Sequence, residues 1–143
     1  MQPKFVHLRF HSEYSITDGI VRLNPAIKQM KEWGVGAFGQ TDLMNMFGSV
    51  RFYESCHKEG IKPILGCDLW ITNEEDPAHP FRLTVYCMDH DGYHSLCVLL
   101  TRAWLENQCH VKGRGEVKES WLAGEGTKGL IGISGGPEGE IQT

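Results

Sequence analysis

The sequence lacks long hydrophobic segments. No apolar run approaches the roughly 18–20 residues that a helix needs to cross a bilayer. The first residues, MQPKFVHLRFHSEYS, contain no apolar core of the kind that a secretion signal needs. We therefore expect no membrane segment, no export and a cytoplasmic location.

The sequence also lacks paired cysteines. Its five cysteines are odd in number, are scattered and form no C-x-x-C pair. This spacing excludes a disulfide framework and a zinc knuckle, so we interpret the cysteines as reduced thiols in a cytoplasmic protein. They are Cys56, Cys67, Cys87, Cys97 and Cys109.

An excess of positive charge is missing as well. The formal net charge is −4 at pH 7. Binding to a nucleic-acid backbone requires a positive surface, so this segment is not expected to hold DNA by its own field. If DNA is involved, we expect another part of a larger assembly to bind it.

What the sequence has is an alternation of strand-like and helix-like segments, with 41% hydrophobic residues in 143, which suits one domain over 1–143. Period-2 or short apolar runs predict strands, and helical spacing between capping signals predicts helices. The sequence therefore predicts an α/β fold with a largely parallel sheet. The expected strands are 4–10, 36–41, 61–71, 83–88 and 129–134; the expected helices are 24–33, 46–59 and 92–105; the expected loops are 72–81 and 106–118.

Each predicted helix has an apolar face that we expect to point inward. The first uses Asn24 and Pro25 as its starting signals and Gly34 as its stop. The third is expected to be capped by Asp91. The expected inward residues are Ile27, Met30 and Trp33 in the first; Phe47, Val50, Tyr53 and Cys56 or His57 in the second; and Leu96, Leu99, Leu100, Ala103 and Trp104 in the third.

The stretch HLRFHS at 7–12 contains two histidines on an alternating segment. On a strand, His7 and His11 would lie roughly 13 Å apart, which is too far for both to bind one zinc ion. The position that would complete a ligand pair is Arg9, and a guanidinium cannot bind a metal. These residues alone therefore do not form a metal site.

Four separated motifs carry a family resemblance: FVHLRFHSEYSITDG, TDLMNMFGSVRFYESC, GIKPILGCD and LIGISGG. They are similar, in the same order, to the PHP (polymerase and histidinol phosphatase) domain, and more narrowly to the PHP domain of bacterial DNA polymerase III alpha subunits. The resemblance implies an irregular, TIM-like barrel of seven strands, (βα)7, with a multi-metal site in active members. Such a barrel needs around 200–250 residues, so we expect 1–143 to be only its N-terminal portion, with strand 129–134 as an open edge.

The resemblance also assigns ligand positions. It retains His11, Asp18 and Asp68 as a vestigial site, and it places non-ligands at four other positions, namely Arg9, Leu43, Arg82 and Gly136. We hypothesise that Arg9 and Arg82 pair with Asp18 and Asp68, replacing metal charge by guanidinium–carboxylate pairs. No catalytic residue and no cofactor are then expected; zinc or manganese is the alternative if the site is still active.

Other motifs have simpler interpretations. GEGTKG at 124–129 precedes a strand and lacks the phosphate-loop pattern, so we expect a loop. SGGPEGE at 134–140 leaves open a phosphate cradle built from backbone N–H groups. His90 and His94 are expected at the surface, the adjacent Cys56 and His57 do not form a dyad, and the four tryptophans are expected to pack.

The resemblance implies a non-catalytic, architectural domain of a replicative polymerase. The implied partners are the proofreading exonuclease subunit and the remainder of the alpha subunit, with DNA bound only through the full holoenzyme. Two alternatives remain: an active metal-dependent phosphoesterase or 3′–5′ proofreading nuclease, and a free-standing interaction module.

Overall fold

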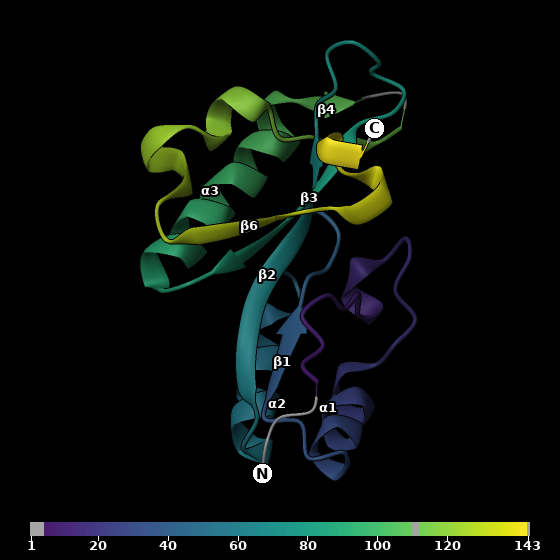
Figure 1. The fold of residues 1–143 in the computed structure, drawn as a ribbon, viewed down its shortest axis with the longest axis vertical. Helices are drawn as coiled ribbons and strands as arrows, with labels where there is room; N and C mark the ends of the chain where they lie inside the picture. Colours follow the sequence, from purple (N-terminus) through teal and green to yellow (C-terminus); the bar gives the residue numbers. More distant parts are fainter. Residues whose placement is uncertain (1–4, 110–111, 143) are drawn as a thin grey trace. The chain divides into compact units, whose positions relative to one another are not determined.

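The computed structural model describes residues 5–109 and 112–142, and the chain divides into two compact units, Met1–Cys67 and Asp68–Thr143 (Figure 1). Each unit is described by itself. Both combine helices with β-strands, which confirms the predicted α/β class. No helix in the described part of the chain is long and apolar enough to span a membrane.

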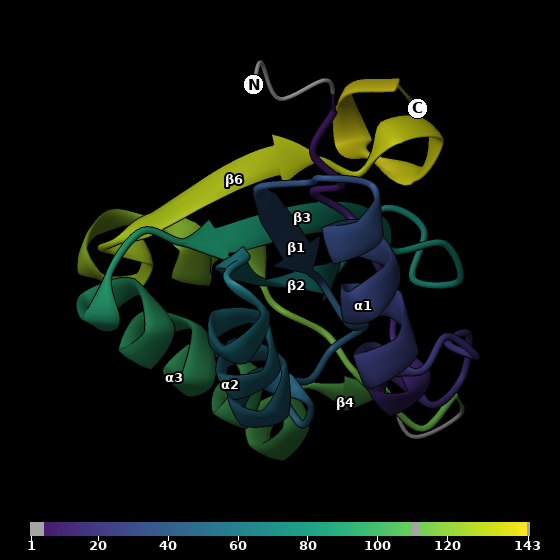
Figure 2. The same cartoon turned by 90° about the horizontal axis from the view of Figure 1, so that it is seen from below.

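The first unit packs two helices against parallel strands. It contains a 3-10 helix η1 (Glu13–Ser15), α1 (Leu23–Glu32), β1 (Ala37–Gln40), α2 (Ser49–Glu59) and the beginning of β2 (Lys62–Ile71). β1 pairs in parallel with β2, with Ala37 opposite Lys62 and Gln40 opposite Leu65. The helices α1 and α2 lie side by side in Figure 2. The core between helices and strands comprises Leu23, Ile27, Met30, Phe38, Phe52, Cys56 and Ile61.

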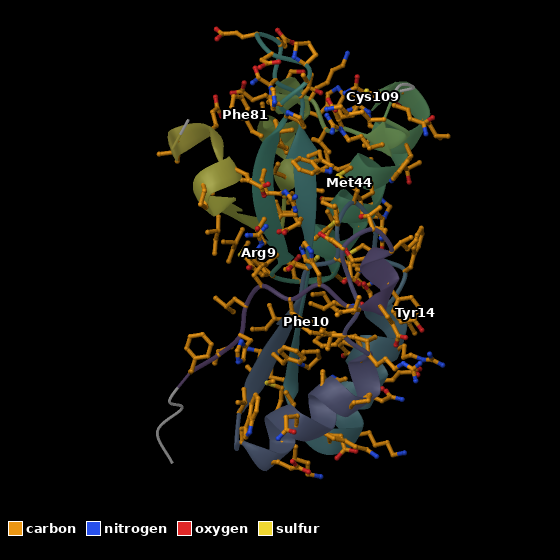
Figure 3. The ribbon with its side chains drawn as sticks, turned by 90° about the vertical axis from the view of Figure 1, so that its right-hand side faces the viewer. Arg9, Phe10, Tyr14, Met44, Phe81 and Cys109 are labelled. Carbon is orange, nitrogen blue, oxygen red and sulfur yellow. The ribbon has the colours of Figure 1, made fainter. Side chains whose placement is uncertain are left out.

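The predicted strand 4–10 is wrong over its described residues, and Lys4 lies outside them. The segment runs beside β1, because Gly39 donates its N–H to the His7 carbonyl and Thr41 to that of Phe10. His7 and Phe10 are three positions apart in the sequence, whereas Gly39 and Thr41 are two positions apart. This extra residue breaks the regular ladder, as a bulge does. The N–H of Phe10 turns to the Thr41 hydroxyl instead, and its ring packs on Phe38 (Figure 3).

Helix positions are confirmed, but two predicted core faces need correction. Trp33 follows the end of α1 and is 63% exposed, because the core side of that helix is completed by Leu23. In α2 the buried residues are Ser49, Phe52 and Cys56, so of the expected inward face only Cys56 is buried. The exposed remainder of that face comprises Phe47, Val50, Tyr53 and His57.

The second unit contains the end of β2, followed in the sheet by β3 (Phe81–Cys87) and then β6 (Leu130–Ser134). Helix α3 (His90–Glu106) packs on β3 and β6. The smaller elements of this unit are β4 (Gln108–Cys109), β5 (Arg114–Gly115) and the 3-10 helices η2 (Glu119–Leu122), η3 (Gly124–Thr127), η4 (Gly136–Glu138) and η5 (Glu140–Gln142).

β6 runs antiparallel to β3, with Leu83 opposite Ser134 and Cys87 opposite Leu130 (Figure 2). The prediction of a largely parallel sheet is therefore wrong in this unit. Residues between α3 and β6 carry the chain back to the end of β3, where Met88 donates its N–H to the Gly129 carbonyl. The last strand consequently begins where β3 ends and runs back along it.

The remaining differences are local. The predicted loop 106–118 contains the antiparallel pair β4–β5, whose two-residue strands are too short to leave a period-2 pattern. Helix α3 begins two residues earlier than expected, and its cap is Asp89, which accepts a hydrogen bond from Gly92 N at 2.9 Å. Trp104 is 39% exposed, while the other four predicted inward residues of α3 are buried.

Candidate functional site: the remnant metal positions

In the first unit a buried carboxylate, Asp42, is held by neutral donors. The Ser12 backbone N–H donates to Asp42 Oδ1 at 2.6 Å, and the Ser12 hydroxyl donates to Oδ2 at 2.8 Å. Gln40 Nε2 donates to the same Oδ2 at 2.7 Å. Asp42 and Ser12 are 2% and 0% exposed. Burial raises the pKa of Asp42 from its usual value, although these hydrogen bonds oppose the shift.

The two retained ligand positions of this unit, His11 and Asp18, contact each other. His11 Nδ1 lies 2.8 Å from Asp18 Oδ2, and the Ser15 hydroxyl donates to Asp18 Oδ1 at 2.5 Å. The expected pairing of Arg9 with Asp18 is wrong. Among the described residues, the partners of the Asp18 carboxylate are His11 and Ser15.

Leu43 follows Asp42 directly and contributes no ligand atom from its side chain. Its backbone N–H donates to the Ser15 hydroxyl at 3.0 Å. The next residue, Met44, is buried and has a φ of 54°, in the left-handed region that a side chain of this size rarely adopts. Asn45 holds this turn by donating to the carbonyls of Tyr14 and Leu43 at 3.0 and 3.1 Å. These hydrogen bonds hold the loop at Leu43, where the family resemblance assigns a ligand position.

In the second unit a buried carboxylate, Asp68, is held by a cation. Asp68 is 0% exposed, and Arg82 Nη1 lies 3.4 Å from its Oδ2. The Thr84 hydroxyl donates to Asp68 Oδ1. Thr84 and Arg82 reach it from alternate positions of β3, which lies beside β2 in the sheet. The hypothesised pairing of Arg82 with Asp68 is thus present in the structure.

The Arg82 guanidinium is enclosed on its other sides. Its Cζ lies 3.9 Å from the centre of the Trp70 ring, and its Nη2 lies 3.4 Å from Glu138 Oε2. Arg82 Nε is buried without a hydrogen-bond partner, and stacking on the indole provides a favourable environment for it. Arg114 also lies over Trp70, at 5.3 Å. Trp70 therefore fixes the guanidinium plane in contact with Asp68.

Gly136 supplies no side-chain ligand and begins η4 with a φ of 68°. The adjacent Gly135 donates its N–H to the Arg82 carbonyl at 3.0 Å, and a Cβ at position 135 would lie 2.4 Å from Arg82 Cβ. Gly139 donates its N–H to the Gly136 carbonyl. Because two backbone donors of this segment are already used within the chain, the phosphate-cradle alternative is weakened.

The donor set does not fit the multi-metal centre that the family resemblance implies. In the first unit, Leu43 has no donor and His11 and Asp18 hydrogen-bond to each other. In the second unit, a permanent cation occupies the space beside Asp68, and like-charge repulsion opposes a metal ion there. Among residues 5–109 and 112–142, no group of three or more His, Cys, Asp or Glu side chains is placed to hold a metal.

The remaining sequence candidates lie away from these carboxylates. His90 and His94 are exposed on α3, as predicted. Cys56 is buried, which raises its thiol pKa to about 12, whereas His57 is exposed and its ring packs on that of Tyr53. Sequence reasoning missed Asp42, Thr84, Glu138 and the stacking role of Trp70. The T-D dipeptide after a short strand was the available signal for Asp42.

Comparison with known proteins identifies the family of the chain. Residues 7–143 match the family model of the PHP domain. The chain belongs to the PHP domain family.

Within that family, the curated relatives include alpha subunits of DNA polymerase III. The subunit of Neisseria meningitidis serogroup B is 41% identical over 140 residues, that of Pseudomonas aeruginosa 39% over 141 and that of Vibrio cholerae 37% over 139. The alignments cover 98%, 99% and 97% of this chain. The chain spans 12% of the length of each of these relatives.

Two solved structures share the fold. An amidohydrolase from Chromobacterium violaceum aligns with a TM-score of 0.54 and 17% identity, covering 68% of this chain and 32% of the other. A structure from Bifidobacterium adolescentis, named for metal-dependent phosphoesterase activity, aligns with a TM-score of 0.50 and 13% identity over the same shares. At these identities the likeness concerns the fold alone.

Proposed function

We propose that this chain is the N-terminal portion of the PHP domain of a DNA polymerase III alpha subunit, and that it is architectural instead of catalytic. The observation that carries the proposal is Arg82, whose guanidinium contacts the buried Asp68 at a position where the family resemblance places a metal ligand. The relatives' shared name and the 12% of their length that the chain spans support the polymerase context.

In this proposal the strands of the two units belong to an irregular, TIM-like (βα)7 barrel that residues outside 1–143 complete. The parallel pair β1–β2 and the likeness to two barrel-sized proteins support it. DNA synthesis would reside elsewhere in the alpha subunit, in the cytoplasm. The partners would be the remainder of that subunit and the proofreading exonuclease subunit, and DNA would be bound only through the holoenzyme, because this segment has a net charge of −4.

Hydrolysis of bis(p-nitrophenyl) phosphate tests the absence of catalysis. We expect no hydrolysis above background with added Mn²⁺ or Zn²⁺, for the wild type and for Asp68→Asn alike. Metal-dependent hydrolysis that Asp68→Asn abolishes would instead establish the alternative, a phosphoesterase or nuclease.

The architectural part is tested in the complete alpha subunit by gel filtration with the exonuclease subunit. If the domain docks its partner without using this site, the wild-type alpha subunit is expected to co-elute with the exonuclease subunit. Deletion of residues 1–143 should abolish co-elution, and the double variant Asp68→Asn with Arg82→Met should retain it. Co-elution that survives the deletion would contradict the docking role.

A further inference from the structure

The second unit carries a groove that the proposed function does not use. Two adjoining pockets, about 510 and 620 Å³ in volume, share Ile71, Phe81, Glu119, Ala123 and Glu140 as lining residues. Both volumes are in the range of ligand-binding sites. We call this pair of pockets the acidic groove. Phe81, at the beginning of β3, is labelled in Figure 3.

The floor of the acidic groove is apolar. Phe81 and Leu83 project from one face of β3. On the same face, Ser134 of β6 lies opposite Leu83. Gly132, the next residue of β6 on this face, has no side chain to cover Leu83. A Cβ built at Gly132 would lie 3.7 Å from Leu83 Cδ1, which is ordinary contact. Ile71, Leu122, Ala123 and Ile141 complete the apolar lining.

The rim is acidic. Glu74, Glu75, Glu119 and Glu140 line the groove, against two cations, Arg82 and Lys118. Arg82 already lies between Asp68 and Glu138. Within the described part of the chain, Glu74, Glu75 and Glu119 form no ion pair. Glu74, Glu75 and Glu119 therefore place negative charge above the apolar floor of the groove.

We propose that the acidic groove binds a peptide segment of a partner protein that combines apolar anchors with lysine or arginine. An apolar floor with an acidic rim is complementary to that chemistry, since side-chain anchors fill the floor and the basic groups meet the glutamates. Nucleic acid and anionic membrane surfaces are repelled by the same rim. The groove shares Arg82 with the Asp68–Arg82 contact, but peptide binding on its floor and rim goes beyond the function proposed above.

Binding is measured on the complete chain by fluorescence anisotropy. The probe is a fluorescein-labelled 14-residue peptide of leucine and lysine, in which leucines recur at every third or fourth position. Gly132→Leu fills the groove without displacing backbone, and Glu75→Lys with Glu119→Lys reverses the rim charge. We expect each variant to weaken binding by about tenfold or more, which corresponds to the loss of a few exposed contacts.

Matched controls carry the same chemical changes elsewhere. Gly36→Leu adds an identical side chain at an exposed glycine with no atom within 4 Å of its Cβ, and Glu54→Lys with Glu125→Lys adds the same charge outside the groove. The controls are expected to bind as the wild type does. The proposal would be overturned if controls and groove variants weakened binding equally, or if all proteins bound equally. It would also be overturned by no binding at all, or by preference for a peptide with glutamates in place of the lysines.

Discussion

Two buried carboxylates, one in each unit, are stabilised in different ways. Asp42 in the first unit accepts hydrogen bonds from Ser12 and Gln40, which are neutral, whereas Asp68 in the second unit faces the guanidinium of Arg82 and the hydroxyl of Thr84. Neutral donors leave the buried carboxyl able to take up a proton at moderate cost. The guanidinium of Arg82 adds a charged partner beside Asp68 that the neutral donors of Asp42 do not supply.

The difference teaches how a family metal position can change without collapse of the fold. A buried carboxylate that loses a divalent ion needs a replacement charge, or it must become neutral. Asp68 has a replacement charge in Arg82, whereas Asp42, which the resemblance does not assign as a ligand, has neutral donors and a pKa that burial raises. Buried Gln40 Oε1 has no hydrogen-bond partner, and with the amide turned over it would accept a hydrogen bond from a protonated Asp42.

The largest expected effect follows removal of the cation. Arg82→Met keeps much of the packing on Trp70 but leaves Asp68 buried without its guanidinium. Breaking a buried ion pair by removal of one partner costs about 3–5 kcal/mol. The free energy of unfolding in urea, followed by tryptophan fluorescence, measures it.

The double variant Asp68→Asn with Arg82→Met separates charge from packing. Because it removes both charges, it should recover a large part of the loss seen in Arg82→Met alone. A single variant that loses less than about 1 kcal/mol, the size of a surface pair, would mean that Asp68 does not depend on this cation.

A smaller effect is expected for a neutral donor of the first unit. Ser12→Ala removes one hydrogen bond to Asp42 Oδ2 and the acceptor that caps η1 at Tyr14 N, while the Ser12 backbone N–H remains. A loss of about 1–2 kcal/mol in the free energy of unfolding is expected. A loss as large as that of Arg82→Met would erase the contrast between the two carboxylates.

The pH dependence sharpens the same contrast. The folded-state pKa of Asp42 is raised above its usual 3.8, so its contribution to stability is full below that value and is lost as pH rises through the raised pKa. Asp42→Asn removes this dependence. The difference in unfolding free energy, wild type minus variant, should therefore fall with rising pH across that window and then stay constant; a difference that rises with pH would show a lowered pKa.

The smallest effect is expected at the exposed pair. The side chains of His11 and Asp18 are 18% and 38% exposed, so solvent screens their interaction. Asp18→Asn should change the free energy of unfolding by less than about 1 kcal/mol. A change above that of Ser12→Ala would indicate that Asp18 anchors the loop from Ser12 through its contact with Ser15.

Part of this account was accessible from sequence. Helical spacing located all three helices, and the contiguous apolar run predicted β2 closely, because those signals are local. The predicted caps Asn24 and Asp91 were wrong, since Arg22 and Asp89 are the N-caps of α1 and α3. The core face of α2 was mistaken, since Phe47, Val50 and Tyr53 show the same helical spacing as Ser49, Phe52 and Cys56. Only tertiary packing decides between two such faces.

The direction of β6 was inaccessible for a related reason. A strand's own residues do not encode which way it pairs, and the path between α3 and β6 depends on short 3-10 turns and two-residue strands. At the candidate site, the resemblance placed Arg82 opposite Asp68 correctly. It could not place Arg9, because the extra residue between His7 and Phe10 alters the segment that carries it.

The central claim, that Arg82 stands in for a metal ion beside Asp68, is tested most directly by metal content. The chain is purified without added metal or chelator, and zinc and manganese are measured by inductively coupled plasma mass spectrometry. We predict that neither metal is present in stoichiometric amount in the wild type. Stoichiometric zinc or manganese in the wild type that is absent from Asp68→Asn would contradict the account.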